Sequence, residues 1–452
     1  MNIIIAGDGK VGSTLVRLLS AEGHDLTLID LNQKTLENTV EQYDVMAAGG
    51  NCASMSVLLD AGIKDADLLI AVTGQDEVNL LCCMTAHGIN PNLHTIARIR
   101  NPEYTEQIHS MRDLFALSMT VNPEKQAALE MEKLLRFPGF LRRESFAKGR
   151  AEIVELRVDD NSKLKDVSLI EMYRIVKCRV LVCAVLRGGK AITPGGQFVL
   201  RSGDRIFVTA PTSNLAMLLK NLDIGTRRVK SCLIGGGGRT GYYLAQLLED
   251  DGIRVRILEK DPERCRILAG ALERAEIIHG DFSDRKVLEA AGLSDCDAFL
   301  SLSGIDEINM VTSLYAASQG VRQVITHLGR PENSVLAGGL GIGSIVCPRE
   351  LCSNDIVRYV RAMENQTGAA ISVHGIADGN AEAVEFLADD TTKNLGVQLK
   401  ELKLRPNVLI ASISHGSKVE IPHGTSTIEN GDSVVVVTTA RGTIDTLNDI
   451  FA

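Results

Sequence analysis

Short apolar runs alternate with helical patterns over the first 120 residues of the chain. The runs predict strands at residues 2–6, 26–30, 44–48, 68–72 and 94–99. Between them, apolar positions at helical spacing predict helices at residues 11–22, from about 33, at 55–61 and at 77–87, with Asn32 and Ser54 as N-caps. Because strands covered on both faces are apolar throughout, the pattern predicts an α/β fold with a doubly wound parallel sheet.

A longer helix is expected at residues 121–137, with Pro123 in its first turn. Its apolar stripe consists of Ala128, Met131, Leu134 and Leu135. This stripe packs either on its own core, which the sequence favours, or on another subunit. From about residue 151 the pattern changes to strands at 152–158, 179–187 and 205–209, with helical turns at 163–173. This stretch predicts a small α+β domain.

The whole arrangement occurs twice. GDGKVG at residues 7–12 recurs as GGGRTG at 236–241, and Asp30 corresponds to Glu259 at the same offset. In the small domain, Gly203-Asp204 recurs as Gly431-Asp432. We therefore expect a tandem duplication with two parallel-sheet domains at residues 1–138 and 227–365, each followed by a small domain, at 139–226 and 366–452.

Each glycine segment follows a strand and opens a helix, which is the setting of a dinucleotide-binding loop. The first glycine permits the tight turn, the second lets a pyrophosphate approach the backbone, and the third allows close helix–strand packing. Asp30 and Glu259 end the next strands, where a carboxylate suits a ribose diol and repels a 2′-phosphate. The pattern favours NAD(H), ATP or ADP over NADP; the alternative is a pair of strand-to-helix turns without a ligand.

Further polar residues match between the copies at the carboxyl ends of predicted strands, where such sheets bind ligands. Asn51 corresponds to Asp281, and Thr73-Gly74 to Ser303-Gly304. Asp-Glu-x-Asn segments at 76–79 and 306–309 open the next helices, and either line the nucleotide or serve as helix N-termini with acids in the first turn. The candidate site residues are Gly7, Asp8, Gly9, Lys10, Val11, Gly12, Asp30, Asn51, Thr73, Gly74 and Arg98 in the first copy, and Gly236, Gly238, Arg239, Gly241, Glu259, Asp281 and Ser303 in the second.

The two copies also differ. Arg98 is positioned either to contact a phosphate and offset Asp8, or to form an ion pair, whereas the second copy has Leu328 there. Asp8 is replaced by Gly237. The two sites are therefore expected to differ in affinity or ligand.

Composition narrows the functional classes. A net charge of −9 and 4% aromatic residues without Trp argue against nucleic-acid binding. The ten cysteines form no CxxC pair and are expected to be buried thiols in a reducing cytosol, rather than disulfides or zinc ligands. No apolar run is long enough to span a membrane, so we expect a soluble cytoplasmic protein.

The sequence shows no catalytic or metal-binding constellation. No Ser-His-Asp set or HExxH motif is present, and the histidines are scattered. Tyr173 and Lys177 match the spacing of a dehydrogenase pair, but they lie outside the parallel-sheet domains and have no counterpart in the second copy. We expect no enzymatic activity.

Taken together, the repeated glycine loops, the acidic strand ends and the small domains resemble regulator-of-potassium-conductance (RCK) domains. The resemblance covers essentially the whole chain. It implies that the sheet domains bind NAD(H) or adenine nucleotides, that the chains assemble as a ring, and that the ring gates a membrane-embedded Trk-type potassium transporter from the inner face of the cell membrane. It carries site roles onto Gly7, Gly9, Gly12, Asp30, Thr73 and Arg98, and onto Gly236, Gly238, Gly241, Glu259 and Ser303. Leu328 departs from the pattern and puts phosphate binding in the second copy in doubt.

Two functions remain as alternatives to a transporter-gating subunit, namely a nicotinamide-dependent oxidoreductase and a free-standing nucleotide sensor.

Overall fold

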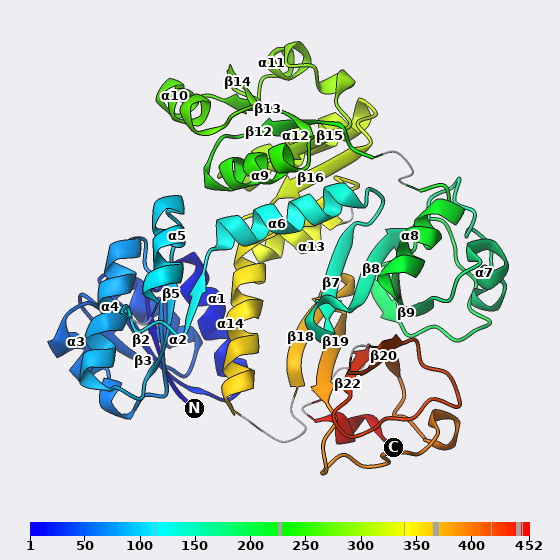
Figure 1. Cartoon of the computed structure of the whole chain (residues 1–452), viewed down its shortest axis with the longest axis horizontal. Coiled ribbons are helices and arrows are strands. Elements are labelled where there is room, and N and C mark those ends of the chain that lie inside the picture. The colour runs from blue at the N-terminus through cyan, green and yellow to red at the C-terminus, as the bar shows by residue number, and fades with distance from the viewer. Residues whose placement is uncertain are drawn as a thin grey trace. The chain divides into compact units, whose positions relative to one another are not determined.

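The computed structural model describes residues 1–112, 114–224, 228–338, 340–364, 370–416, 418–439, 444 and 446–452 (Figure 1). It confirms the predicted fold class, with two parallel sheets that are each followed by a small antiparallel sheet. The predicted domain borders at 226/227 and 365/366 fall on residues outside the described ranges.

The first sheet has the strand order β3-β2-β1-β4-β5-β6. Its strands are β1 (Asn2–Ala6), β2 (Asp25–Asp30), β3 (Met46–Gly49), β4 (Leu68–Ala71), β5 (His94–Arg98) and β6 (Met119–Val121). The connecting helices are α1 (Lys10–Ala21), α2 (Gln33–Gln42), α3 (Met55–Asp60), α4 (Asp76–Ile89) and α5 (Pro102–Met111). Strand order reverses between β1 and β4, which places a topological switch point at the carboxyl end of β1.

The second sheet repeats this order as β14-β13-β12-β15-β16-β17. Its strands are β12 (Ser231–Gly235), β13 (Arg254–Glu259), β14 (Glu276–His279), β15 (Ala298–Ser301), β16 (Gln323–His327) and β17 (Ser344–Val346). Its helices are α9 (Arg239–Asp250), α10 (Pro262–Ala271), α11 (Arg285–Ala290), α12 (Asp306–Ser318) and α13 (Pro331–Gly338). The switch point lies between β12 and β15.

The first small domain is a sheet of order β10-β9-β11-β8-β7. It contains β7 (Arg142–Phe146), β8 (Ala151–Arg157), β9 (Leu181–Arg187), β10 (Lys190–Ile192) and β11 (Arg205–Ala210), with α7 (Leu169–Val176) and α8 (Thr212–Asn221). The second has the order β18-β19-β22-β20-β21, from β18 (Ala370–Ile376), β19 (Ala381–Leu387), β20 (Val408–His415), β21 (Lys418–Glu420) and β22 (Ser433–Thr438). Phe146, Phe207, Ile376 and Val437 belong to one buried cluster that both small domains share.

Two helices connect parts of the chain that are distant in sequence. Residues Pro348–Val360 of α14 (Pro348–Glu364) form one compact unit with Met1–Ala127, although this helix follows the second sheet. Conversely, α6 (Pro123–Arg136) belongs from Ala128 onward to the second unit. The stripe of α6 is buried, as predicted, but its apolar residues group with the second unit rather than with the sheet that they follow.

Other differences from the predicted elements are local. Asn32 caps α2, since its side chain accepts from the Thr35 N–H (3.4 Å), but Ser54 makes no side-chain cap and pairs with the Ser56 hydroxyl at 2.9 Å instead. α5 and β6 were not predicted. None of the helices in the described part of the chain is both long and apolar enough to cross a membrane.

The cysteines agree with the prediction of buried thiols. All ten are free, and nine are buried, with Cys265 half-exposed. Among the described residues, no group of three or more His, Cys, Asp or Glu side chains is arranged to hold a metal ion.

Candidate functional site

The first glycine loop lies at the switch point of the first sheet. Gly7 directly follows β1 with φ +108°, and a Cβ there would lie 2.9 Å from the Thr73 backbone nitrogen. In the second sheet, Gly236 has φ +110° and its Cβ would lie 2.9 Å from the Leu302 carbonyl oxygen. Only glycine suits both the positive φ and the close approach of the neighbouring strand end. The structure thus brings the first loop against Thr73 and the second against Leu302 and Ser303.

The other two glycines of each loop serve different purposes. A Cβ on Gly12 or Gly241 would collide with the carbonyl oxygen of Gly7 or Gly236, so these glycines allow the helix to pack against the strand. At Gly9 and Gly238, by contrast, no heavy atom of the described residues lies within 4 Å of the position that a Cβ would take. The loop is therefore open at the second glycine, where a pyrophosphate would approach.

The acidic strand ends hold the loops in place. Asp30 accepts hydrogen bonds from the backbone N–H of Asp8 (2.7 Å) and of Asn32 (2.8 Å). Glu259 accepts in the same way from Gly237 (2.8 Å) and Asp261 (2.9 Å). Each carboxylate oxygen has a second lone pair, so both acids can still accept from ribose hydroxyls. Asp30 and Glu259 lie beside their glycine loops, as a dinucleotide site requires.

Asp8 gives the first loop a buried charge. Its side chain is 6% exposed, and Oδ2 accepts from the Thr39 hydroxyl of α2 at 2.6 Å. Burial raises the pKa of the Asp8 carboxyl, the Thr39 hydrogen bond opposes this, and the nearby Asp30 raises it further. The first loop therefore presents an acid that holds its proton more tightly than usual.

The second loop has no room for such an acid. A Cβ on Gly237 would meet the Leu268 side chain, and it would lie 3.1 Å from Glu259 Oε2. Instead, Arg264 of α10 donates from Nε to the Gly237 carbonyl at 2.7 Å and from Nη2 to the Gly238 carbonyl at 3.4 Å. Thr39 and Arg264 were not predicted from the sequence, where their only signal is a polar residue on the helix after the acidic strand end.

The Asp-Glu-x-Asn segments brace the strand ends from inside. Asn79 is fully buried; its Oδ1 accepts from the Thr73 N–H (2.9 Å) and hydroxyl (2.7 Å), and its Nδ2 donates to the Arg98 carbonyl (2.8 Å). Asn309 makes the same bonds to Ser303 (2.9 and 2.8 Å) and His327 (2.8 Å). These asparagines tie the carboxyl ends of adjacent strands together and hold Thr73 and Ser303 at the switch points.

The aspartates of these segments hold the following loop. Asp76 Oδ2 accepts from the backbone N–H of Arg100 and of Asn101, both at 2.7 Å. Asp306 accepts from the N–H of Gly329 (2.7 Å) and Arg330 (3.1 Å). The acids stand in the first turns of α4 and α12, but their partners are loop amides, so they act as a structural brace rather than as simple helix termini.

The remaining candidates lie around the loops. Lys10 and Arg239 are exposed at the first positions of α1 and α9, and Val11 is buried beneath the loop. Asn51 and Asp281 each close a short turn, accepting from the N–H of Ala53 (3.0 Å) and Ser283 (2.9 Å). Gly74 is exposed beside Thr73, and its carbonyl accepts from Arg100.

Arg98 is held in an ion pair. Its Nη2 lies 3.4 Å from Glu124 Oε1, and both side chains are largely buried. Burial lowers the pKa of the Arg98 guanidinium, and Glu124 opposes that shift. Leu328 in the second copy is fully buried in apolar surroundings. Of the two roles open for Arg98, the ion pair is present, and a phosphate contact would require its guanidinium to leave Glu124.

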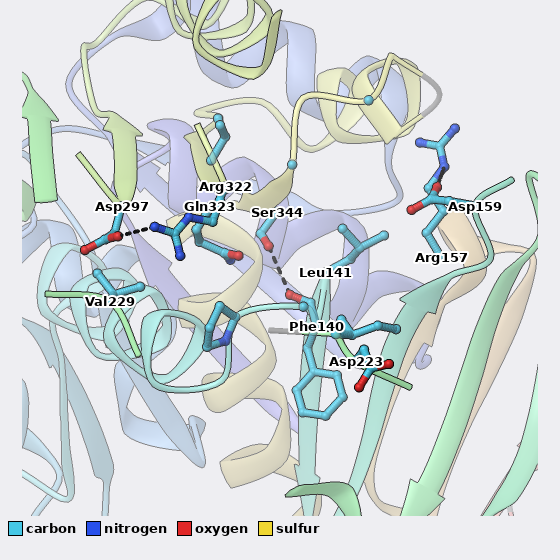
Figure 2. A pocket seen from close by; sticks show the side chains of 16 residues that line it. Phe140, Leu141, Arg157, Asp159, Asp223, Val229, Asp297, Arg322, Gln323 and Ser344 are labelled. Carbon is cyan, nitrogen blue, oxygen red and sulfur yellow. Dashed lines mark hydrogen bonds and ion pairs between the residues drawn. The ribbon is translucent and has the colours of Figure 1, made fainter. Parts of the chain in front are cut away.

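A separate cavity of about 770 Å³ lies in the second unit, between β16 and β17 of the second sheet and the segments beside β7 and β12 (Figure 2). Four of its charged side chains form two ion pairs, Arg322 with Asp297 at 2.8 Å and Arg157 with Asp159 at 3.4 Å, whereas Asp223 pairs with Lys163 at 2.6 Å. Ser344 donates to the Phe140 carbonyl at 3.2 Å across it. None of the predicted site residues lines this cavity.

Comparison with known proteins gives the family. The TrkA-N domain model matches residues 3–123 and 232–348, and the TrkA-C domain model matches 153–223 and 383–452. The chain is 30% identical to the Trk system potassium uptake protein TrkA of Haemophilus influenzae, covering 100% of this chain and 98% of that protein. It is 32% identical to the TrkA homolog of Archaeoglobus fulgidus, covering 96% and 97%.

Solved structures support the fold. The GsuK channel bound to NAD superposes with a TM-score of 0.61 at 17% identity, covering 97% of this chain and 77% of that chain. GsuK bound to ADP gives a TM-score of 0.53 at 13% identity, covering 80% and 69%. The prediction of a non-enzyme agrees with the relatives, whose names describe potassium uptake. On these matches, the chain belongs to the TrkA family of potassium uptake proteins, with the TrkA-N and TrkA-C domains present twice in tandem.

Proposed function

We propose that this chain is a nucleotide-binding regulatory subunit that assembles as a ring on the inner face of the cell membrane and gates a membrane-embedded Trk-type potassium transporter. Its ligands are NAD(H) and, at the same sites, ATP or ADP. Family membership supports the potassium-transport role, and the names of the GsuK structures, bound to NAD and to ADP, support the ligand class.

The observation that carries the ligand assignment is the open face at the second glycine of each loop. In both copies, the first and third glycines are closed off by neighbouring backbone, and only Gly9 and Gly238 face open space. The first-turn amides of α1 and α9 have no earlier helical carbonyl to bond, which leaves them available to an anion at the helix start. Asp30 and Glu259 lie beside it, where they can accept from a ribose diol.

The proposed mechanism is differential binding between two ring conformations. In the first copy, a bound dinucleotide would contact the α1 amides, the Asp30 carboxylate and the strand end at Thr73. ATP and ADP share the adenosine end but place different charge beside Asp8. A ligand shifts the ring only by the difference between its affinities for the two conformations, so ligands that compete for one loop can favour opposite states.

The two copies are proposed to bind unequally. The first loop contains the buried Asp8 acid, whereas Arg264 spans the carbonyls of the second loop. Leu328 stands where the first copy has Arg98, but the Arg98 guanidinium is already paired with Glu124, so this exchange takes no unpaired cation from the second site. The second site is therefore the better one for a dense anionic charge close to the loop, and the first depends more on the ribose contact.

Replacing the second glycine of each loop by alanine, which adds one methyl group, tests the nucleotide sites. Gly9 has φ −82° and Gly238 has φ −62°, so alanine fits both backbones, and open space surrounds both positions. Gly9→Ala and Gly238→Ala should leave the fold unchanged but obstruct the first and second sites respectively, at a cost of about 1–3 kcal/mol, or roughly 5- to 150-fold in affinity. Calorimetric titrations of the purified chain with NAD+, NADH, ATP and ADP measure this.

The matched control is Gly88→Ala, which adds the same methyl to an exposed position in α4 with open space around it. It should bind every nucleotide as the unaltered protein does. Potassium flux through the reconstituted transporter should lose its nucleotide dependence in the double variant Gly9→Ala/Gly238→Ala. Unchanged affinities in that double variant would overturn the site assignment, and nucleotide-independent flux in the unaltered protein would overturn the gating role.

A further inference from the structure

The cavity in the second unit lies at the edge of the second sheet opposite to its glycine loop. Gln323 begins β16 and Ser344 begins β17, so the cavity meets the amino ends of these strands, whereas the loop at residues 236–241 follows the carboxyl end of β12. Another wall comes from the first small domain, where Arg157 ends β8. Its volume of about 770 Å³ is within the range of small-molecule pockets. The cavity is therefore a candidate binding site that is separate from the nucleotide sites.

The side-chain amide of Gln323 is buried without a partner. Only 7% of this residue is exposed, and none of the described residues forms a hydrogen bond with its side-chain amide. The side chain lines the cavity (Figure 2). A buried amide without a hydrogen-bond partner lowers the stability of the folded state. An occupant of the cavity that bonds to this amide would remove that cost.

In the first sheet, polar side chains at the corresponding edge are paired within the protein. There β5 begins at His94, whose Nδ1 lies 2.9 Å from the Tyr359 hydroxyl. The Ser118 hydroxyl, just before β6, accepts from the Thr95 N–H at 3.1 Å. The same strand order therefore forms with satisfied side chains at this edge, so the fold itself does not require the free amide of Gln323.

The charged groups of the cavity leave hydrogen-bond donors unused. Asp297 Oδ1 accepts from Arg322 Nη2 at 2.8 Å, and Asp297 Oδ2 accepts from the N–H groups of Lys230 (2.9 Å) and Ser231 (3.1 Å). Among the described residues, this bond takes one of the five N–H donors of the Arg322 guanidinium. The other two aspartates of the cavity are in ion pairs as well. The acids are satisfied and the spare groups are donors, which favours an anionic ligand.

A second guanidinium reaches the cavity from the first small domain. Arg157 Nη1 lies 3.8 Å from the position that a Cβ on Gly341 would take, beside the loop before β17. Its ion pair with Asp159 joins Nε to Oδ1 at 3.4 Å, and 41% of the Arg157 side chain is exposed. Figure 2 shows Arg157 and Arg322 on opposite sides of the cavity. The cavity thus presents two cationic groups that are separated from each other.

We propose that this cavity binds an organic anion whose two carboxylates are separated by an apolar body. One carboxylate accepts from the Arg322 guanidinium and the Gln323 amide, and the other accepts from the Arg157 guanidinium. The half-buried side chains of Leu141 and Ile224 also line the cavity and pack against the apolar body. Because the two arginines belong to different domains, the bound anion connects the first small domain to the second sheet and stabilises the folded chain.

Titration calorimetry of the full chain with straight-chain dicarboxylates of about four to ten carbons tests the site. We expect saturable binding of one anion per chain, with an optimum at one chain length. At that length the dicarboxylate should bind at least tenfold more tightly than the monocarboxylate with the same number of carbons, and should raise the midpoint of thermal unfolding. Absence of saturable binding across the whole series would overturn the proposal.

The double variant Gly9→Ala/Gly238→Ala separates this site from the nucleotide sites. Dicarboxylate affinity should be the same in this variant as in the unaltered protein, because neither glycine lines the cavity. Loss of dicarboxylate binding in the double variant would place the anion at the glycine loops and overturn the proposal. A protein that binds the dicarboxylate but no nucleotide would contradict the proposed function alone.

Three variants test the residues of the cavity. Gln323→Leu removes the unpartnered amide at similar size, so it should be at least as stable as the unaltered protein but bind the optimal dicarboxylate at least tenfold more weakly. Arg157→Gln should weaken binding to a similar degree. Asp159→Asn should strengthen binding roughly threefold, because it releases Arg157 from its ion pair. Unchanged affinity in both Gln323→Leu and Arg157→Gln would overturn the proposal.

The matched control is Arg285→Gln. Arg285 is an exposed arginine of α11 that pairs with Glu289 at 2.9 Å and does not line the cavity. This variant should bind the dicarboxylate as the unaltered protein does. A loss of affinity in Arg285→Gln equal to that in Arg157→Gln would show that the anion responds to overall charge rather than to the cavity, and would overturn the proposal.

Discussion

At the scale of single residues, the two glycine loops differ most in charge. Asp8 stands in the first loop with a hydrogen bond from Thr39, and Gly237 in the second leaves space that the Leu268 side chain fills. Asp8 and Thr39 are 31 residues apart and form one polar pair, while Gly237 and Leu268 form the apolar equivalent. The two copies therefore differ at both residues of this contact, which is polar in the first loop and apolar in the second.

The buried Asp8 acid predicts a pH dependence of the first site. A raised pKa means that the folded state holds the Asp8 proton more tightly than the unfolded chain, so the stability from protonated Asp8 is present at low pH and is lost as pH rises through the raised pKa. Phosphate close to the loop adds negative charge and favours the proton further. ATP affinity should fall as pH rises from acidic to neutral.

The variant Asp8→Asn keeps an acceptor for Thr39 and removes the charge. It should bind ATP more tightly at neutral pH by about 1 kcal/mol, roughly fivefold, and its affinity should no longer vary with pH. Titration calorimetry at several pH values, carried out in Gly238→Ala to isolate the first site, measures this. Parallel pH profiles for the two proteins would contradict the role of Asp8.

Single residues were predictable where the chemistry is local in sequence. The glycines and Asp30 stand at fixed places after their strands, so their type and spacing identified them. Thr39 and Arg264 act through contacts with residues 31 and 27 positions away, and nothing in the sequence marks those pairs. For Asn79, the sequence predicted the Asp-Glu-x-Asn motif but not the hydrogen-bond partners of the asparagine side chain.

At the scale of elements, the two small domains meet through corresponding edge strands. The rings of Phe146 in β7 and His374 in β18 contact edge to face, with centroids 4.8 Å apart. Glu144 Oε2 lies 2.7 Å from His374 Nδ1, and Arg142 pairs with the same carboxyl at 2.6 Å. Burial alone would raise the pKa of Glu144, but these two partners hold it at about 2.

This ion-pair network predicts how the interface responds to acid. A lowered pKa contributes stability that is fully present above the ordinary value of 4.5 and is lost as pH falls through about 2. Glu144→Gln should therefore lower the free energy of unfolding by about 3 kcal/mol near neutral pH, with the difference shrinking in that acid window. Thermal or urea unfolding of both proteins over the pH range measures this.

Glu276→Gln is the control, since Glu276 is an exposed glutamate of β14. It should unfold as the unaltered protein does at every pH. A constant difference between Glu144→Gln and the unaltered protein down to the lowest pH would show that Glu144 contributes packing rather than charge.

The elements of the sheet domains were predicted well because their apolar runs report burial on both faces. All strands proposed for the first domain are present with ends shifted by a residue or two. α5 and β6 were missed because residues 102–121 lack a continuous apolar run or a wide stripe. The Ser54 cap was wrong because the residue type favours a cap, whereas its hydroxyl has a closer partner in Ser56.

At the scale of the whole molecule, the duplication does not produce two independent halves. The first compact unit takes residues Pro348–Val360 from the second half, where Tyr359 contacts His94 Nδ1 at 2.9 Å and Gln126 bonds to Asp355. The apolar stripe of α6 predicted burial, but a stripe does not specify its partner. The sequence repeat therefore identified the order of domains and missed the shared helix.

The shared helix predicts a long-range effect of mutation. Ile356 in α14 is fully buried, so Ile356→Ala should cost about 2–5 kcal/mol and increase amide exchange in the first sheet, more than 230 residues earlier in sequence. The matched Ile342→Ala, which is buried with Leu328 in the second unit, should increase exchange near β16 and β17 instead. Hydrogen-exchange mass spectrometry separates the two patterns. Increased exchange near β17 alone in Ile356→Ala would contradict the assignment of α14.

The same helix sets the order in which the protein matures on the ribosome. Residues up to Ala127 emerge first, but the segment that completes their unit begins at Pro348. At about 5–20 residues per second, the roughly 220 residues between them take roughly 10–45 s to synthesise. Throughout that interval the nascent first sheet lacks residues Pro348–Val360 of its compact unit. The domain that is translated first is thus among the last to be finished.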